Sequence, residues 1–259
     1  MLYSGNSHDT TMGYIGTSSF SENDKDPMYA GYMYGTTGSL KNNRTNTNDS
    51  TIKVAVDTWY QNNLLTNYDK YISKSAIYCN DRSVGSGTYN TGRASFYFGA
   101  KTRLYDNKTP SYKCGANTDS GLFESTQTVA DKFSASTSGG GNGQLKYPIA
   151  LMTADEIVFA GGKVGTSLSN PYAWYYTNSH GESITDDTWW WFLSPGAWNG
   201  SLATVWGVSG SGGPGYFNDG FVSRDLAVRP SVSLASCVGI KSGNGTPESP
   251  YEVDESSCE

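Results

Sequence analysis

The feature that most constrains this chain is a stretch of tryptophan and glycine between residues 189 and 230. Five of the seven tryptophans and eight glycines lie within residues 189–220. Large flat side chains are thus set in a backbone that glycine allows to take unusual turns. Rigid aromatic rings provide contact area at low entropic cost, and the small polar residues between them provide adaptable hydrogen bonds. This composition is typical of a binding surface.

Composition favours an irregular fold in one domain. Aromatic residues make up 14% of the 259 residues and charged residues only 16%, so the core must rely on tyrosine and tryptophan more than on leucine and isoleucine. Such a balance predicts a loop-rich α+β or mostly β protein. The length would allow one large or two small domains. We expect one domain over residues 1–236 and a small tail over residues 237–259.

The acidic charge limits the partners. A net charge of −6 and a pI near 4.9 argue against nucleic acid and against an anionic membrane surface, because no basic patch is available to displace counterions. No apolar run is long enough to span a bilayer, and the N-terminus has neither a basic region nor an apolar region of the kind that directs export. The chain is therefore either cytosolic or a fragment without its signal and anchor. We favour the fragment, which would meet a membrane only through that absent anchor.

The cysteines indicate disulfides. They are Cys79, Cys114, Cys237 and Cys258. No CxxC pair is present and the chain has only His8 and His180, so a zinc site is not expected and no other metal or cofactor is indicated. Disulfides 79–114 and 237–258 are favoured over four unpaired buried thiols, because the surroundings of the cysteines are polar. Such bonds predict a location outside the cytosol.

Two helices are expected. Asn48 and Asp49 are good N-cap residues for a segment with apolar side chains at helical spacing. Those side chains are Ile52, Val56, Trp59, Tyr60 and Leu64. The second helix follows Thr153, which can form a capping box with Glu156, and it should end at Gly161 and Gly162.

Extended segments are expected elsewhere. Residues 94–105 alternate enough to form a strand, residues 147–151 form a buried strand, and residues 202–210 and 226–235 give the clearest strands. Residues 113–145 contain few apolar side chains and end in a glycine run, so they predict a long mobile excursion held by Cys114. The tail from residue 237 predicts turns and a short strand.

No motif for catalysis is complete. The sequence around Ser209 and Ser211 lacks GxSxG spacing, and the glycine runs at residues 139–141 and 212–213 are not followed by GK[ST] or a helix. Paired acids at residues 155–156 are better explained by a helix N-terminus and those at residues 186–187 by a solvated turn. A Ser-His-Asp triad would have no supporting motif. We therefore expect a protein that is not an enzyme.

A calcium site is the weaker of two interpretations for one acidic loop. Asn218, Asp219 and Asp225 could supply hard oxygen ligands, but EF-hand spacing is absent. A polar loop that bonds to itself or to a partner explains these residues better.

The tryptophans divide between core and surface. Because successive side chains of a strand face opposite ways, Trp189 and Trp191 should face one side and Trp190 the other, and most of this triplet should be core. Four later aromatic residues are separated by glycine, serine and asparagine, which cannot help to build a core. Exposure is therefore expected for Trp198, Trp206, Tyr216 and Phe221.

Several phrases resemble a known family. They are YAGYMYG, NDSTIK, DTWY, CNDRS, YPIALMTADE, WWWFLSP and AVRPSVSL. They are similar to gut-bacterial surface proteins with a C-type lectin fold of the formylglycine-generating-enzyme type, several of which are variable proteins of diversity-generating retroelements. The resemblance covers nearly the whole chain. It implies an α+β, C-type lectin-like fold with two helices, small antiparallel sheets and much irregular loop, preceded in family members by a hydrophobic, pilin-like or signal segment.

The resemblance also implies a diversified, exposed face within about residues 189–230. In such proteins a retroelement mutates adenines in a C-terminal stretch, and the varied side chains bind the ligand. By this analogy the ligand-binding residues are Ala197, Trp198, Asn199, Ser201, Ala203, Trp206, Ser209, Ser211, Tyr216, Asn218, Asp219, Phe221, Ser223, Arg224 and Asp225. The expected partner is a protein or glycan on another cell or on a phage surface.

The sequence departs from two groups of proteins that have this type of fold. Formylglycine-generating enzymes use a cysteine pair in the core, whereas Cys237 and Cys258 follow the last core strand. Calcium-dependent C-type lectins use Glu-Pro-Asn and Trp-Asn-Asp, where this chain has residues 169–171 as Ser-Asn-Pro and residues 198–200 as Trp-Asn-Gly. The leading interpretation is a ligand-binding display protein. The alternatives are a structural pilus or cell-surface subunit that uses the aromatic face for assembly and, third, an enzyme of the formylglycine-generating type.

Overall fold

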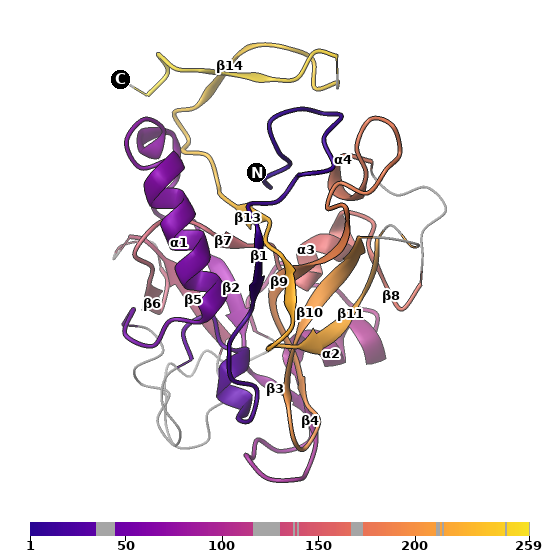
Figure 1. Ribbon diagram of the computed structural model, residues 1–259. Coiled ribbons are helices and arrows are strands. Elements are labelled where there is room, and N and C mark those ends of the chain that lie inside the picture. The colour runs from indigo at the N-terminus through magenta and orange to yellow at the C-terminus, as the bar shows by residue number, and fades with distance from the viewer. Residues whose placement is uncertain are drawn as a thin grey trace.

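A central mixed sheet of eight strands organises the protein (Figure 1). The computed structural model describes residues 1–34, 45–115, 130–136, 138, 140–166, 173–210, 213, 215–246 and 248–258. The sheet has the order β1 (Thr17–Ser19), β12 (Asp225–Ala227), β9 (Asp187–Trp198), β10 (Ala203–Gly210), β11 (Tyr216–Phe221) and β8 (Lys163–Val164). The hairpin of β3 (Val84–Ser86) and β4 (Phe96–Phe98) joins it through pairing of β4 with β9.

Smaller sheets surround the central one. They are β2 (Tyr78–Asp81) with β5 (Ala130–Ser134) and β6 (Gly143–Gln144), β7 (Ala150–Leu151) with β13 (Pro230–Ser231), and β14 (Gly239–Ser242) with β15 (Glu252–Asp254). Together with short helices they make an α+β protein, as expected. The expected small sheets are present beside the central sheet, but that sheet is larger and mixed, because β12 pairs with β9 and β8 pairs with β11 in parallel.

The helices are few and mostly short among the described residues. They are η1 (Pro27–Ala30), α1 (Thr51–Asn63), η3 (Asp69–Tyr71), α2 (Gly99–Lys101), the π-helical turn η4 (Thr102–Asp106), α3 (Ala154–Phe159) and α4 (Ala173–Tyr176). Helix α1 runs alongside the sheet system (Figure 1). Of its expected apolar face it buries Ile52, Val56 and Tyr60, while Trp59 and the C-cap Leu64 are partly buried. Its N-cap is Ser50 rather than Asn48 or Asp49, because the Ser50 Oγ accepts the amide of Lys53 at 3.3 Å. The capping box of Thr153 and Glu156 is present.

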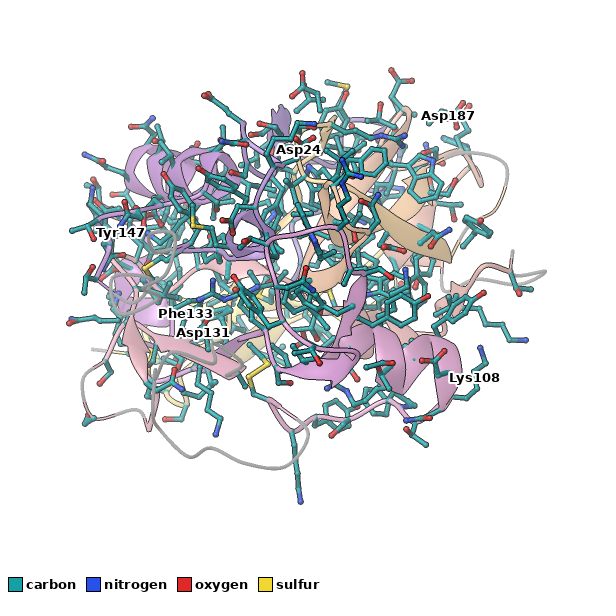
Figure 2. The ribbon with its side chains drawn as sticks, turned by 90° about the horizontal axis from the view of Figure 1, so that it is seen from below. Asp24, Lys108, Asp131, Phe133, Tyr147 and Asp187 are labelled. Carbon is teal, nitrogen blue, oxygen red and sulfur yellow. A yellow bond between two sulfur atoms is a disulfide. The ribbon has the colours of Figure 1, made fainter. Side chains whose placement is uncertain are left out.

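Two expectations for extended segments need correction. Residues 94–105 are a strand only over Phe96–Phe98 and then turn into α2 and η4. Within residues 113–145, the strand β5 pairs with β2 and buries Phe133, so this segment is not a simple excursion. Figure 2 shows Asp131 and Phe133 on this strand, well away from Asp187 at the start of β9. Residues 116–129 lie outside the described part of the chain.

The tryptophan triplet supplies both hydrophobic layers of the molecule. Trp191 belongs to the cluster that packs against α1, and Trp190 belongs to a second cluster on the opposite face of β9. Trp189 is only partly buried and meets the ring of Tyr216 edge-on, with the ring centroids 5.7 Å apart. The alternation expected for this triplet is therefore confirmed, because a strand buried on both faces must place large side chains on each.

A buried arginine fastens the N-terminal segment to the end of the sheet. Arg229 is fully buried and donates through Nε to the carbonyls of Tyr3 and Gly13, each at 3.1 Å, and through Nη1 to the carbonyl of Tyr175. Its guanidinium also lies 4.6 Å from the ring centre of Trp190. Next to it, β1 pairs with β12 through Thr17 and Ala227.

Both expected disulfides are present, Cys79–Cys114 and Cys237–Cys258. The second closes the hairpin β14–β15, which lies beyond the end of the main body (Figure 1). Tyr71 ties this tail to the body by donating its hydroxyl to the carbonyl of Glu255 at 2.6 Å. Two disulfides indicate an oxidising, extracellular environment. None of the helices in the described ranges is long and apolar enough to cross a membrane.

Candidate functional site

The expected ligand-binding residues divide into a buried and an exposed group. The buried ones are Ala197, Trp198, Ala203, Trp206 and Ser209. The expectation that Trp198 and Trp206 are exposed is wrong. The Nε1 of Trp198 donates to the carbonyl of Gly92 at 2.7 Å, and the ring of Trp206 packs edge-on against Phe217 at 5.4 Å. Five of the fifteen residues are therefore inside the fold and cannot touch a ligand from solvent.

Most of the exposed group gathers at one end of the central sheet. Asn199 and Ser201 are exposed in the β9–β10 turn, Ser223 and Arg224 in the turn from β11 to β12, and Asp225 at the first residue of β12. Phe221, the last residue of β11, is partly buried beside them. The two turns meet because the amide of Val222 donates to the carbonyl of Ala203, at the first residue of β10. We call these six residues the sheet-end surface.

The remaining expected residues do not join this surface. Tyr216 lies at the opposite end of β11, roughly 17 Å from Phe221 at the usual rise of a strand. Asn218 is exposed midway between them. Ser211 lies outside the described residues. The fifteen residues therefore do not form one continuous face.

The β9–β10 turn is fixed by its own hydrogen bonds. The Oδ1 of Asn199 accepts the amides of Ser201 at 3.0 Å and Leu202 at 2.9 Å. Gly200 has a φ of 89°, and a Cβ at this position would lie 2.3 Å from the carbonyl oxygen of Arg93. Asn199 therefore shapes the turn, while the side chain of Ser201 is left on its exposed rim.

The second turn carries a cation on an aromatic ring. The guanidinium of Arg224 lies 5.3 Å from the ring centre of Phe221, and the Oγ of Ser223 donates to Asp24 at 2.6 Å. A cation over a partly exposed ring combines charge with apolar area. Arg224 and Phe221 are thus the groups of the sheet-end surface best suited to anchor a partner.

Asp219 has a structural role. Its two carboxylate oxygens accept Lys101 Nζ at 2.8 and 2.9 Å, and Thr204 donates to it at 2.7 Å. Lys101 also lies 4.7 Å from the ring centre of Tyr97. The carboxylate thus locks β11 to α2. The Oδ1 of Asn218 accepts the amide of Asp219, so this side chain also bonds within its own strand. Within the described residues, no cluster of three acidic, histidine or cysteine side chains could hold a metal ion.

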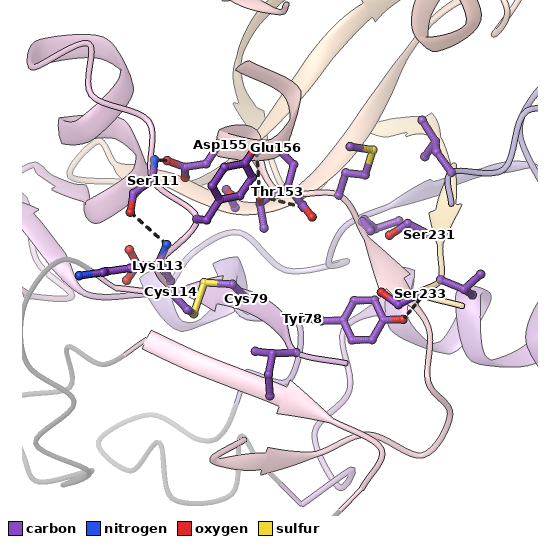
Figure 3. A pocket seen from close by; sticks show the side chains of 18 of the residues that line it. Tyr78, Cys79, Ser111, Lys113, Cys114, Thr153, Asp155, Glu156, Ser231 and Ser233 are labelled. Atoms are coloured by element: carbon purple, nitrogen blue, oxygen red, sulfur yellow. Dashed lines mark hydrogen bonds between the residues drawn. A yellow bond between two sulfur atoms is a disulfide. The ribbon is translucent and has the colours of Figure 1, made fainter. Parts of the chain in front are cut away.

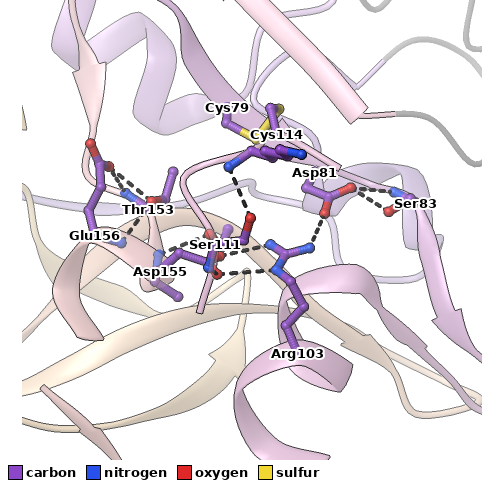
Figure 4. Close-up of polar contacts among 12 residues, drawn as sticks. Cys79, Asp81, Ser83, Arg103, Ser111, Cys114, Thr153, Asp155 and Glu156 are labelled. Carbon is purple, nitrogen blue, oxygen red and sulfur yellow. Dashed lines mark hydrogen bonds and ion pairs between the residues drawn. A yellow bond between two sulfur atoms is a disulfide. The ribbon is translucent and has the colours of Figure 1, made fainter. Parts of the chain in front are cut away.

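A cavity of about 500 Å³, which the sequence analysis missed, lies apart from the sheet-end surface (Figure 3). Its polar network joins Arg103 of η4 to Asp155 of α3 through two bonds, of 3.1 and 2.8 Å, and to Asp81 of β2 at 2.6 Å (Figure 4). Burial alone would lower the pKa of Arg103, but hydrogen bonds and attraction from both carboxylates outweigh it and raise this pKa. The acid at residue 155 is thus more than a helix-terminal charge, although local sequence gave no sign of its distant partners.

The cavity also contains phenols that stay protonated at neutral pH. Burial raises the pKa of Tyr78 to about 12 and raises that of Tyr175 above its ordinary value. The disulfide Cys79–Cys114 forms part of the wall (Figure 3). Both sulfurs are bonded, and no described cysteine is free to act as a thiol.

No protein-family model, curated protein or solved structure matches this chain. Function is therefore inferred from the residues and their geometry.

Proposed function

We propose that this protein is an extracellular ligand-binding protein without enzymatic activity, in which a C-type lectin-like scaffold displays the sheet-end surface. Its partner is a protein or glycan on another cell or on a phage surface. The observation that supports this proposal comes from the described part of residues 190–225: the tryptophans there are buried, and short polar side chains form an exposed rim around Arg224 and Phe221.

This division suits a surface whose side chains can be replaced. Exposed substitutions that leave backbone and core intact usually change stability by no more than about 0.5 kcal/mol. Ser201, Arg224 and Asp225 meet that condition, because they are exposed and lie where other residues set the backbone, the first two in turns and Asp225 at the start of β12. A retroelement could diversify such positions without disturbing the two layers that contain Trp190 and Trp191.

The proposal can be tested with two matched variants. The first replaces Ser201, Ser223, Arg224 and Asp225 by alanine. The control replaces Gln61, Asn62, Lys241 and Glu248 by alanine, so it removes the same numbers of neutral, basic and acidic exposed side chains. The wild type and both variants are fluorescently labelled and measured on a glycan array and on intact gut bacteria by flow cytometry, beside their melting temperatures.

We expect all three proteins to melt within a few degrees of one another and only the first variant to lose binding. Equal loss of binding in the control, or full retention by the first variant, would contradict the proposal. A large fall in the melting temperature of the first variant would show that these side chains stabilise the fold instead.

Sequencing of closely related loci gives an independent test. Diversification predicts adenine-specific changes at the codons of Ser201, Ser223, Arg224 and Asp225. The codons of the buried Trp198 and Trp206 should stay unchanged. Changes spread evenly over buried and exposed codons would contradict a diversified surface.

A further inference from the structure

The cavity described above is built from segments that are far apart in the chain. Asp81, Arg103 and Asp155 line it, and we call these three side chains its floor. The loop that ends at Cys114, Ser194 and Ser233 also line it. None of its lining residues belongs to the sheet-end surface. Its volume of about 500 Å³ is within the range of ligand pockets, roughly 300–1,000 Å³.

The floor offers donors and acceptors side by side. Asp81 and Asp155 are 1% and 4% exposed, so their positions are fixed. All three guanidinium nitrogens of Arg103 donate to these carboxylates, which uses three of the five N–H groups of the side chain. Each carboxylate keeps an oxygen, Asp81 Oδ2 and Asp155 Oδ2, that accepts one hydrogen bond and has room for a second. A hydroxyl group, which both donates and accepts, matches this alternation.

The charges of Asp81, Arg103 and Asp155 are paired with one another, because Arg103 is shared between the two carboxylates. Glu156 accepts the amide and the hydroxyl of Thr153 at 2.7 and 2.9 Å (Figure 4). At these side chains an ionic ligand would have to compete with the existing bonds, whereas a neutral polar ligand can add hydrogen bonds to them. The exposed residue Ser233, which also lines the cavity, adds a hydroxyl group to this polar lining.

An aromatic ring stands at the edge of the cavity. Tyr112 lines it, is 79% exposed, and stacks on Phe159 with the ring centroids 3.9 Å apart and the planes at 9°. Phe159 covers one face of the Tyr112 ring, and the high exposure leaves the other face open to solvent. An open ring beside an array of hydroxyl-binding groups suits a ligand with an apolar C–H face and several hydroxyls.

We propose that this cavity binds a neutral sugar as a free monosaccharide. Arg103, Asp81 and Asp155 bind neighbouring hydroxyls, and the ring of Tyr112 packs against the C–H face. The site is separate from the sheet-end surface, so the two can be tested independently.

Saturation-transfer difference NMR tests this with D-glucose, D-galactose, D-mannose, L-fucose and N-acetyl-D-glucosamine as probes. Inorganic phosphate and L-lysine serve as charged probes. The variant Ser233→Trp fills the cavity from an exposed position, and Tyr112→Ala removes the ring. Gln61→Trp, on an exposed position of α1, is the control for an added tryptophan.

We expect at least one neutral sugar to bind the wild type, Gln61→Trp and the sheet-end variant alike. Both Ser233→Trp and Tyr112→Ala should weaken that binding about tenfold or more, with melting temperatures unchanged. If Ser233→Trp does not fold, Tyr112→Ala decides. The proposal is overturned if no sugar of the panel binds, if only phosphate or lysine binds, or if the variants that fold bind sugar as the wild type does.

Discussion

Strands β10 and β11 are neighbours in the same tryptophan- and glycine-rich stretch, yet they differ in burial. Seven of the eight residues of β10 are buried, whereas Phe217 is the single buried residue among the six of β11. The strand β10 lies between β9 and β11, while β11 has only the two-residue strand β8 on its other side. Position in the sheet, rather than composition, therefore decides which aromatic residues of the stretch are framework.

The largest expected effect comes from the centre of β10. Trp206→Ala should lower the free energy of unfolding by about 3–5 kcal/mol, because it removes a fully buried ring and leaves a cavity. Asn218→Ala on β11 should change it by less than about 0.5 kcal/mol, because this side chain is exposed. Urea unfolding of both variants measures the difference. Similar losses would break the contrast between the two strands.

The next effect concerns the one polar anchor of β11. Asp219→Ala should cost about 2–3 kcal/mol, because it leaves the mostly buried Lys101 without its carboxylate. A double-mutant cycle with Lys101→Ala measures the coupling between the two side chains. A coupling near zero would mean that the ion pair does not hold β11 to α2.

A pair of glycine substitutions should have smaller and opposite effects. In β10, a Cβ at Gly207 would lie 3.1 Å from the carbonyl oxygen of Trp190, so Gly207→Ala should destabilise by about 1 kcal/mol. In β11, the nearest atom to a Cβ at Gly220 is a ring atom of Trp191 at 3.9 Å, so Gly220→Ala should be neutral or stabilise by up to about 1 kcal/mol. Thermal melts distinguish the two, and a reversed order would show that β11 is the more tightly packed strand.

A small effect on stability is expected just beyond β11. Arg224→Ala removes an exposed cation from the ring of Phe221 and should change stability by no more than about 0.5 kcal/mol. The same change should sharply weaken binding to the cells or glycans that the wild type recognises. Urea unfolding and flow cytometry on the same preparation test both halves of this expectation.

Local features of the fold could be predicted from the sequence. The face of α1, the capping box at Thr153 and the alternation of Trp190 and Trp191 depend on residues a few positions apart. The predicted disulfides are the observed ones, because each cysteine pairs with its neighbouring cysteine along the chain.

Features that depend on distant partners could not be predicted. Trp198 looked exposed between small residues, but its ring nitrogen bonds to a carbonyl at Gly92 in another hairpin. The cavity was missed for the same reason, since Asp81, Arg103 and Asp155 come from three separate elements and none carries a local motif. Among the expected binding residues, those in the β9–β10 turn and in the turn from β11 to β12 are exposed, whereas those in β10 are buried.

The pairing of β1 with β12 has a kinetic consequence. These strands come from opposite ends of the chain, and Arg229, which fastens the N-terminal segment, is only four residues beyond Asp225, where β12 starts. Contacts between such remote segments carry a large loop-closure cost and slow folding. The N-terminal segment therefore has no partner strand until residues 225–229 have folded against it. Before this docking step, the unpaired strand can pair with another copy of the chain.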